Sequence, residues 1–442
     1  YTPTSVRSGL SEALENYLND FGIAQMAEKL AEHSRGERKR EFRTYARYFR
    51  ERAKAYVHMF DAQVGFFQGR NDDGTWRLSP EEYDPRVWGC DYTETNGWGM
   101  AFSVPHDGQG LANLYGGRKG LEDKLDAYFS NPETAEFPGC YGDVIHEMRE
   151  AAYVQMGQFG ISNQPAHHIP YMYNYAGMPA KTQAKVREAL SRLFLGSEIG
   201  QGYPGDEDTG ELSAWYVFSA LGFYPLHLGT EYYAIGSPLF TSATINLENG
   251  KKIVVEAPNN SPENVYVRGL RVDGKPYDKT YISHHVLADG AVLTFDMAPK
   301  PSRWGTGKKS LPPSITTGEE PPNPLQDLTG PTRGSATSSE GDASKLFDDT
   351  SQSAVTFTGA DPAVTWSFAG GYQRTARYYT LTSGDEAGDP TGWTLEGSRD
   401  GEQWRTLDRR TGQEFRWRNE TRVFEIDDPA PYAHYRLRLG TG

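Results

Sequence analysis

The strongest constraint on the fold is a change of residue periodicity near residue 230. Upstream of it, apolar residues recur at helical spacing, as in Leu10, Leu14 and Leu18. Downstream, apolar and polar residues alternate as they do in strands, for example over 243–247 and 252–256. We therefore expect a helical region at residues 1–230 and a β-rich segment at 231–300 that completes the same unit.

The helical region has long, aromatic-rich connections between its predicted helices. Helical patterns cover 9–60, 108–130, 143–158, 167–176, 181–194 and 209–221. Residues 61–100 are instead rich in Gly, Trp and Tyr turns. Helix pairs joined by long polar and aromatic loops favour an α/α toroid, in which the loops build a cleft, over a plain helical bundle.

Two further segments follow the β-rich segment. Residues 301–325 lie in a Pro-, Gly- and Ser-rich stretch, which predicts an extended linker. Residues 326–442 contain short alternating strands with turn signals about every ten residues, which indicates a β-sandwich. The chain is thus expected to be multidomain.

Composition excludes some partners and leaves others open. The 442 residues include 59 acids and 45 bases, a net charge of −14, which argues against nucleic acid or an anionic membrane as the main partner. The sequence contains no run of 18 apolar residues, so it predicts no membrane-spanning segment. Aromatic residues make up 13% of the chain, which suits sugar binding, but packing in cores is the commoner explanation of such a content.

Two details bear on the compartment of the protein. Cys90 and Cys140 are the two cysteines, and either a disulfide or two buried thiols fits the sequence. Tyr1 is not a start Met, so we expect a processed or cut chain, and a missing signal peptide says little.

The turn Gly205–Gly210 places three acids directly before an apolar helical run. Asp206 and Asp208 are two residues apart, so a loop could direct both carboxylates to one cleft. A glycosidase needs one carboxylate to activate water and one acid to protonate the departing oxygen. The alternative interpretation is structural: Asp208 as the N-cap and Glu211 three residues later form a capping box.

Three motifs in this order resemble glycoside hydrolase family 92, the calcium-dependent, exo-acting, inverting α-mannosidases. The first motif runs from Asp91 to Trp98 and continues to Val104-Pro105-His106-Asp107. The second is Asn163-Gln164-Pro165-Ala166-His167-His168, and the third is the acidic turn with its Ser213-Ala214-Trp215-Tyr216 helix.

The resemblance covers roughly residues 1–300 and implies a fold. Family members have an N-terminal β-sandwich followed by an (α/α)6 barrel. The chain would hold a partial (α/α)6 toroid and the β strands after it, and would lack the N-terminal sandwich and the first barrel helices. We therefore expect one part of a larger, secreted enzyme that acts on mannose-containing glycans.

The resemblance also implies roles for individual residues. Asp206 and Asp208 match the paired aspartates of the general base, and Glu94 matches the general acid. Two neighbouring carboxylates repel, which raises the basicity of one of them. The remaining matches are predicted to bind the sugar: Trp98, His146, Glu147, Gln164, His167 and His168.

Calcium is the implied cofactor. Asn163, Gln164 and Glu150 are its predicted ligands, since calcium takes hard oxygen donors from amides, carbonyls and carboxylates. In the family the ion is thought to hold the 2- and 3-hydroxyls of the sugar. His167 and His168 cannot readily share one ion, because adjacent helical residues point about 100° apart.

Two departures from the family pattern leave the substrate open. Gln164 stands where relatives usually have Glu, and the first motif reads Glu-Thr-Asn-Gly-Trp-Gly instead of Glu-Gly-Asn-Ala-Trp-Gln. If residue 164 served as the acid, the enzyme could still release a phosphate, which leaves as an anion without a proton. The alternatives are therefore removal of mannose from mannose-1-phospho-6-mannose, or a non-catalytic mannan-binding protein.

The C-terminal segment has its own resemblance. Residues 334–350, Leu395–Trp404 and Tyr435–Leu439 resemble parts of a discoidin-like or family 32 carbohydrate-binding module. A sugar would then meet the Gly-rich loops at 369–371 and 384–391. A spacer sandwich without a ligand is the alternative.

Overall fold

The computed structural model describes residues 8–71, 73–195, 202–330, 332–386 and 388–440. The chain forms two compact units, the first made of Tyr1–Met26 with Phe49–Pro324 and the second of Ala27–Tyr48 with Leu325–Gly442. The predicted combination of a helical domain with β-sheet domains is confirmed. The toroid and the C-terminal sandwich stay predictions.

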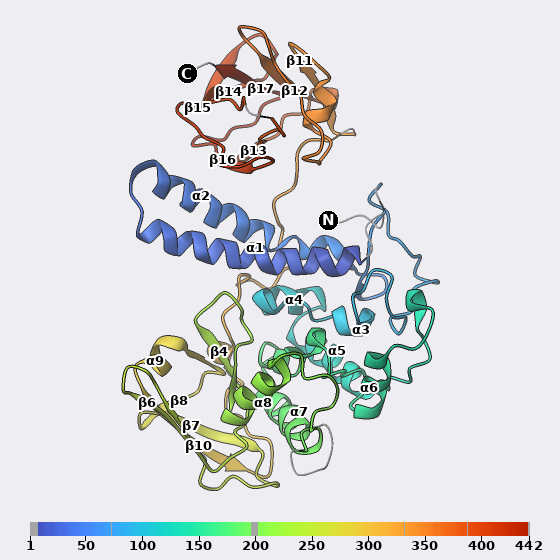
Figure 1. Cartoon of the computed structure of the whole chain (residues 1–442), viewed down its shortest axis with the longest axis vertical. Helices are drawn as coiled ribbons and strands as arrows, with labels where there is room; N and C mark the ends of the chain where they lie inside the picture. The colour runs from blue at the N-terminus through green and yellow to red at the C-terminus, as the bar shows by residue number, and fades with distance from the viewer. Residues whose placement is uncertain (1–7, 72, 196–201, 331, 387, 441–442) are drawn as a thin grey trace. The chain divides into compact units, whose positions relative to one another are not determined.

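The helices follow the apolar periodicity of the sequence (Figure 1). The long helices are α1 (Gly9–Glu32), α2 (Gly36–Arg52), α5 (Arg118–Ser130), α7 (Pro179–Arg192) and α8 (Glu211–Leu221). Shorter ones are α3 (Gly97–Met100), α4 (Gly108–Leu114), α6 (His146–Val154) and α9 (His284–Ala288). The predicted helix over 167–176 is a 3-10 helix, Ile169–Asn174, and the one over 108–130 is broken at Tyr115–Gly117.

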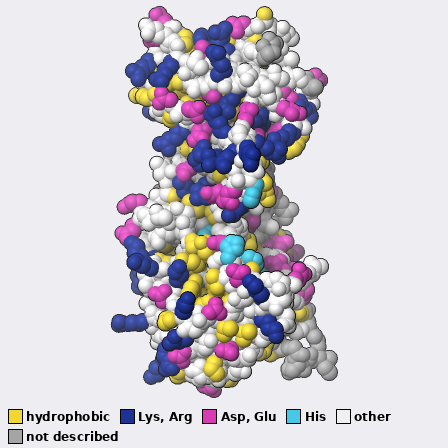
Figure 2. Space-filling model, turned by 90° about the vertical axis from the view of Figure 1, so that its left-hand side faces the viewer, with side chains coloured by type: hydrophobic (Ala, Val, Ile, Leu, Met, Phe, Trp, Pro, Cys, Tyr) yellow, Lys and Arg dark blue, Asp and Glu magenta, His cyan; other side chains and the backbone are white. Residues whose placement is uncertain are grey.

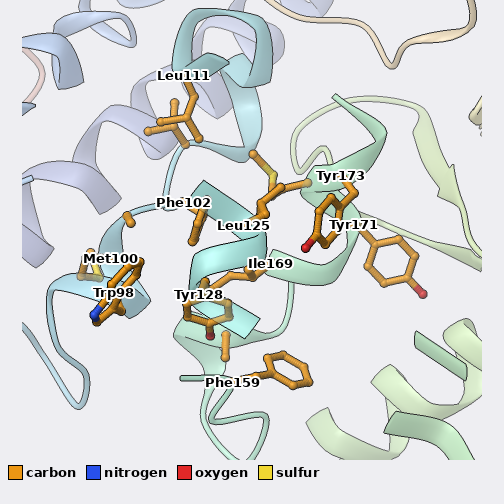
Figure 3. Close-up of a cluster of buried hydrophobic side chains, with 14 of the residues drawn as sticks. Trp98, Met100, Phe102, Leu111, Leu125, Tyr128, Phe159, Ile169, Tyr171 and Tyr173 are labelled. Carbon is orange, nitrogen blue, oxygen red and sulfur yellow. The ribbon is translucent and has the colours of Figure 1, made fainter. Parts of the chain in front are cut away.

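Aromatic and aliphatic side chains form the core of the first unit (Figure 3). Phe102 packs edge-on against Tyr128 of α5, with 5.4 Å between ring centroids. Trp98, Leu111, Ile169 and Tyr171 belong to the same cluster. Burial of such side chains stabilises each by about 1.5–3 kcal/mol, so this core fixes the loops that follow α3, α5 and the Ile169–Asn174 helix.

Three sheets complete the first unit. The largest has the order β5 (Ser242–Asn246), β6 (Lys252–Glu256), β10 (Ala291–Ala298), β7 (Tyr266–Val272), β8 (Lys275–Tyr277). Its strands β6 and β10 are parallel, while the other pairs are antiparallel. A three-stranded sheet has the order β3 (Phe223–Tyr224), β4 (Tyr232–Ile235), β9 (Tyr281–Ser283). A two-stranded sheet pairs β1 (Phe60–Asp61) with β2 (Phe66–Phe67).

The second unit is mostly β structure. One antiparallel sheet has the order β11 (Gly334–Ser338), β12 (Ala363–Phe368), β17 (His434–Gly440), β14 (Gly392–Ser398), β15 (Trp404–Arg410). A second sheet pairs β13 (Tyr378–Thr382) with β16 (Thr421–Glu425). Residues 36–48 of α2 also belong to this unit, and Glu41 among them bridges Arg422 at 3.2 Å. Ala387, inside the predicted sugar-binding loop, lies outside the described residues.

The segment predicted as an extended linker is held against the first unit. Asp107 accepts hydrogen bonds from the hydroxyl groups of Ser314 (2.6 Å) and Thr316 (2.7 Å). Asn113 donates to the carbonyl oxygen atoms of Gly318 and Glu320. The first unit therefore extends to Pro324.

Two further properties concern the described part of the chain. Acidic and basic side chains are interspersed over the face shown in Figure 2. Among the described helices, none has the length and apolarity needed to cross a membrane.

Candidate functional site

Glu207, and not Asp208, caps the helix that follows the acidic turn. Its carboxylate accepts hydrogen bonds from the amide groups of Gly210 (2.7 Å) and Ser213 (3.1 Å) and from the Ser213 hydroxyl. These bonds lower the pKa of Glu207, with the Ser213 hydroxyl as the largest cause. The capping-box interpretation of Asp208 is therefore wrong, and neither exposed aspartate of the turn is used to start α8.

Asp208 is instead joined to the second motif. The side-chain amide of Gln164 donates a hydrogen bond of 2.6 Å to one carboxylate oxygen of Asp208. Asp208 has a φ of +56°, a left-handed conformation that Asp tolerates better than most residues. The side chain remains exposed, so one oxygen atom is oriented by Gln164 while the carboxylate stays open to solvent.

Glu94 is joined to the residue next to Gln164. The side-chain amide of Asn163 donates to the backbone carbonyl of Glu94 over 2.8 Å. The backbone amide of Glu94 donates to the Tyr141 hydroxyl over 2.7 Å. Glu94 has a φ of +52°, and its side chain is exposed. Both backbone groups of Glu94 are thus fixed while its carboxyl group is left open.

His146 at the start of α6 bridges two carboxylates. Its Nε2 lies 3.2 Å from Glu147 Oε1, and its Nδ1 lies 3.2 Å from Glu150 Oε1. Burial acts to lower the pKa of His146, but the hydrogen bond to Glu150 and the charges of Glu147, Glu150 and Asp206 raise it above its ordinary value. The Asp206 charge therefore lies close enough to act on this imidazole.

Gly205 allows the acidic turn to approach α6 closely. A Cβ atom at this position would collide with the Ser162 side chain and lie 2.5 Å from Glu150 Oε2. The turn that carries Asp206 consequently packs directly against residues of α6 and of the second motif. The structure thus brings Glu94, Asn163, Gln164, Glu150, His146 and both aspartates into one neighbourhood.

The same neighbourhood is rich in oxygen donors. Among the described residues, Glu147 Oε2 and Ser162 Oγ are buried without a hydrogen-bond partner. Glu150, Ser162, Asn163 and Gln164 all offer oxygen atoms, which is the donor type that calcium takes. No group of three or more His, Cys, Asp or Glu residues in the described ranges is arranged for a metal ion. Any ion here would thus depend on amide, hydroxyl and carbonyl oxygen atoms as well as on carboxylates.

Three residues predicted to bind the sugar are committed to internal contacts. The ring of His167 bonds to the Ile161 carbonyl (2.8 Å) and to Glu211 (3.0 Å). His168 bonds to the Phe102 carbonyl over 2.7 Å, and burial lowers its pKa to about 4. Trp98 is only 9% exposed and belongs to the buried cluster of Figure 3. Its ring packs edge-on against Phe66. The chemistry available at the site does not require these three side chains.

Some residues of the site carried no recognisable sequence signal. Tyr141 supports Glu94 through a contact 47 residues apart in sequence, and Ser162 lies beside the second motif as an ordinary small residue. Tyr141 follows Cys140, which forms a disulfide with Cys90. The one available hint was the position of Tyr141 directly after Cys140, because a disulfide to Cys90 brings it beside the first motif.

The arrangement allows acid and base chemistry on a bound molecule. Exposed carboxylates come from two loops, with Glu94 on one and Asp206 and Asp208 on the other. The adjacent amides of Asn163 and Gln164 hold one loop each, the first through the Glu94 backbone carbonyl and the second through the Asp208 carboxylate. Hydrolysis by a water-activating base and a separate acid needs a pair of carboxyl groups.

Comparisons with known proteins identify a family and several relatives. The model of the glycosyl hydrolase family 92 catalytic domain matches residues 1–299. A protein of Arthroderma benhamiae described as an uncharacterized secreted glycosidase is 28% identical over 266 residues, which are 58% of this chain and 31% of that protein.

Solved structures give the same result. The family GH92 inverting mannosidase BT2199 from Bacteroides thetaiotaomicron is 36% identical, with a TM-score of 0.59 over 70% of this chain and 40% of its own. The α-mannosidase BT3965 of the same organism, in complex with mannoimidazole, is 32% identical, with a TM-score of 0.62 over 72% of this chain and 40% of its own. The chain therefore spans well under half the length of these relatives.

Proposed function

Because the chain belongs to glycosyl hydrolase family 92, we propose that it hydrolyses terminal α-linked mannose from glycans with inversion at the anomeric carbon. The observation that carries this proposal is the pair of amide hydrogen bonds from adjacent residues, Asn163 to the Glu94 loop and Gln164 to Asp208. These bonds support the proposal because they tie the Glu94 backbone and the Asp208 carboxylate, which come from distant parts of the sequence, to adjacent residues. The inverting mannosidase among the similar structures supports the stereochemistry.

In the proposed mechanism, Asp206 and Asp208 form the general base. One of them takes a proton from water, whose oxygen atom attacks the anomeric carbon. We propose Asp208 as the one that takes the proton, because Gln164 holds its carboxylate, whereas the charge of Asp206 acts on His146. Glu94 is the general acid and gives its proton to the departing oxygen atom. Because its backbone is fixed at both groups, little reorganisation is needed.

The remaining polar residues bind the sugar in this proposal. His146 and Glu147 begin α6, and we propose that they bind the sugar. We further propose that the protein is secreted, as its Arthroderma relative is described to be. The mannoimidazole complex of a similar structure supports a mannose-type ligand.

Calcium is proposed as the cofactor. Glu150, Asn163 and Gln164 would hold it, and the unpartnered hydroxyl of Ser162, which lies next to Gly205 as Glu150 does, fits an oxygen-only ligand set. When bound, the ion would hold two hydroxyl groups of the sugar and favour distortion of its ring.

A second candidate substrate is mannose-1-phospho-6-mannose. Gln164 favours it, because an amide at this position cannot protonate a leaving group, and a phosphate needs no proton. A non-catalytic mannan-binding protein is the third possibility, and the two loops of exposed carboxylates argue against it.

The experiment that tests the proposal removes the base. Asp206→Asn and Asp208→Asn in the full-length protein should each lower kcat by about 10²–10⁴-fold, the usual contribution of a general base, while the circular dichroism spectrum is unchanged. Glu207→Gln is the matched control, since it neutralises the acid between them that only caps α8. Near-normal turnover in both Asn variants would remove the pair from the mechanism.

Chelation tests the metal. Treatment with EDTA should abolish mannose release, and added Ca²⁺ should restore it, because the ion is proposed to hold the sugar ring for attack. Full activity in the chelated protein would contradict the calcium proposal.

A further inference from the structure

Glu133, in the loop after α5, is a buried acid that the proposed mechanism does not use. The residue is only 7% exposed. Glutamate is rarely buried unless its oxygen atoms accept hydrogen bonds, because an unpaired charge loses its hydration. The donors that surround Glu133 therefore indicate what this carboxylate holds in place.

Both oxygen atoms of Glu133 accept hydrogen bonds. Oε2 accepts from the indole N–H of Trp88 (3.1 Å) and from the side-chain amide of Asn96 (3.4 Å), and Oε1 accepts from the backbone N–H of Ala135 (2.8 Å). Burial raises the pKa of Glu133 above its ordinary value, although the hydrogen bonds from Ala135 and Trp88 act to lower it. Trp88 precedes Glu94 in the chain and Asn96 follows it. One oxygen atom thus joins the two ends of the loop that carries Glu94.

The loop between these two ends is closed and has an unfavourable backbone. The backbone N–H of Gly89 donates to the Thr95 carbonyl over 3.1 Å, which closes the base of the loop. Cys90 and Glu94 both have left-handed backbone conformations, with φ of +61° and +52°. Residues other than glycine keep such a conformation only where surrounding contacts impose it. The shape of the loop therefore depends on the contacts that hold its ends.

Asn96 connects the carboxylate of Glu133 to further elements. Its side-chain oxygen atom accepts hydrogen bonds from the amide groups of Trp98 (3.0 Å) and Gly99 (3.1 Å), which caps α3. Its side-chain amide also donates to Gln158 over 2.9 Å, in the segment after α6. The end of the loop is thus fixed by residues from three separate parts of the chain.

We propose that Glu133 is a positioning residue for Glu94. By holding Trp88 and Asn96, its carboxylate keeps the loop between them in the conformation in which the Glu94 carboxyl group meets the departing oxygen atom. The inference rests on the proposed function, in which Glu94 is the general acid. The step itself is unchanged: Glu94 gives its proton to the glycosidic oxygen atom as the bond from that oxygen to the anomeric carbon breaks.

Two substrates that differ in their need for an acid test this role. The sugar that leaves α-1,2-mannobiose has to be protonated, whereas dinitrophenolate leaves 2,4-dinitrophenyl α-mannoside as a stable anion. A misplaced Glu94 should slow only the first reaction. A general loss of structure should slow both.

Glu133→Gln in the full-length protein keeps the shape of the side chain but replaces one acceptor oxygen atom with an NH2 group, which faces a donor in either orientation. It should lower kcat for mannobiose by about 10–100-fold, the scale of a misplaced catalytic group. It should change kcat for the dinitrophenyl substrate by less than about threefold. Glu94→Gln should show the same selectivity with a larger loss on mannobiose, about 10²–10⁴-fold. Glu136→Gln is the matched control, because Glu136 is an exposed acid of the same loop, and it should match wild type on both substrates.

Two results in a folded Glu133→Gln variant would overturn the inference and leave the mannosidase proposal intact: an equal loss on both substrates, or wild-type turnover of mannobiose. If circular dichroism shows that this variant is unfolded, Trp88→Phe decides by the same comparison, because it removes the indole N–H donor and keeps an aromatic ring. Equal losses on both substrates in Glu94→Gln, or no mannose release by wild type, would instead overturn the proposed function together with the inference.

Discussion

His146 stands among three acidic side chains, those of Glu147, Glu150 and Asp206. The hydrogen bond to Glu150 and the three charges outweigh burial and raise the pKa of His146 above 6.5. A raised pKa in the folded state means that the protonated imidazole contributes stability below pH 6.5, the unfolded value. This contribution is lost as the pH rises through the folded-state pKa.

This environment predicts a titration that NMR can follow. The pKa of His146 should lie above 6.5, and Glu150→Gln should lower it, because the principal hydrogen-bonding carboxylate is removed. Glu248→Gln, a change at an exposed acid elsewhere, should leave it unmoved. A His146 pKa at or below 6.5 in the unmodified protein would contradict the described contacts.

At this scale the sequence identified the residue types of the site but not all their roles. Asp206, Asp208 and Glu94 are exposed in loops, and their catalytic roles stay predictions. The sequence could not decide between Glu207 and Asp208 as the cap of α8, because both lie within reach of free amide groups. Contact with Gln164, 44 residues earlier, decides that Asp208 faces the second motif.

The disulfide between Cys90 and Cys140 closes a 50-residue loop between the first motif and the segment before α6. Closing a loop of this length stabilises a protein by about 4 kcal/mol in the chain-entropy estimate. The Cys90→Ser, Cys140→Ser double variant should therefore lose up to ~4 kcal/mol of unfolding free energy in urea titrations. Dithiothreitol should destabilise wild type similarly and the double variant not at all.

A double variant as stable as wild type would show that the loop is held by other contacts alone. The sequence left this bond open, since two cysteines fit a disulfide or two thiols equally.

Helices and strands were easier to predict from the sequence, because periodicity reports directly on burial: β6 lies at the predicted residues. The 3-10 helix Ile169–Asn174 was harder to predict, because every one of its residues is buried and no polar face reveals its period.

On the scale of the whole molecule, residues after the family match complete the first unit. The match ends at residue 299, yet Ser314 and Thr316 satisfy the buried carboxylate of Asp107, together with the Tyr56 hydroxyl at 2.9 Å. Proline content predicted an extended linker, but it reports only on local backbone stiffness. Composition does not reveal that Ser314 and Thr316 are the hydrogen-bond donors to the buried Asp107 carboxylate.

Removing these two hydroxyl groups tests the role of the segment. Ser314→Ala combined with Thr316→Val should lower the free energy of unfolding by about 3 kcal/mol, because hydrogen bonds to a charged group contribute ~1.5–3 kcal/mol each. The measurement is urea unfolding followed by tryptophan fluorescence. Thr317→Val, an exposed neighbour, is the control and should change stability by less than about 0.5 kcal/mol. Equal stability of the two variants would mean that the segment is not part of the folded unit.

The central claim is that an oriented aspartate activates water on the face opposite Glu94. The most direct measurement is ¹H NMR of the first mannose released from α-1,2-mannobiose by the full-length protein, before mutarotation. Attack from the opposite face predicts β-mannose from wild type and no detectable product from Asp208→Asn on the same timescale. Initial release of α-mannose, or an unchanged rate in Asp208→Asn, would contradict the account.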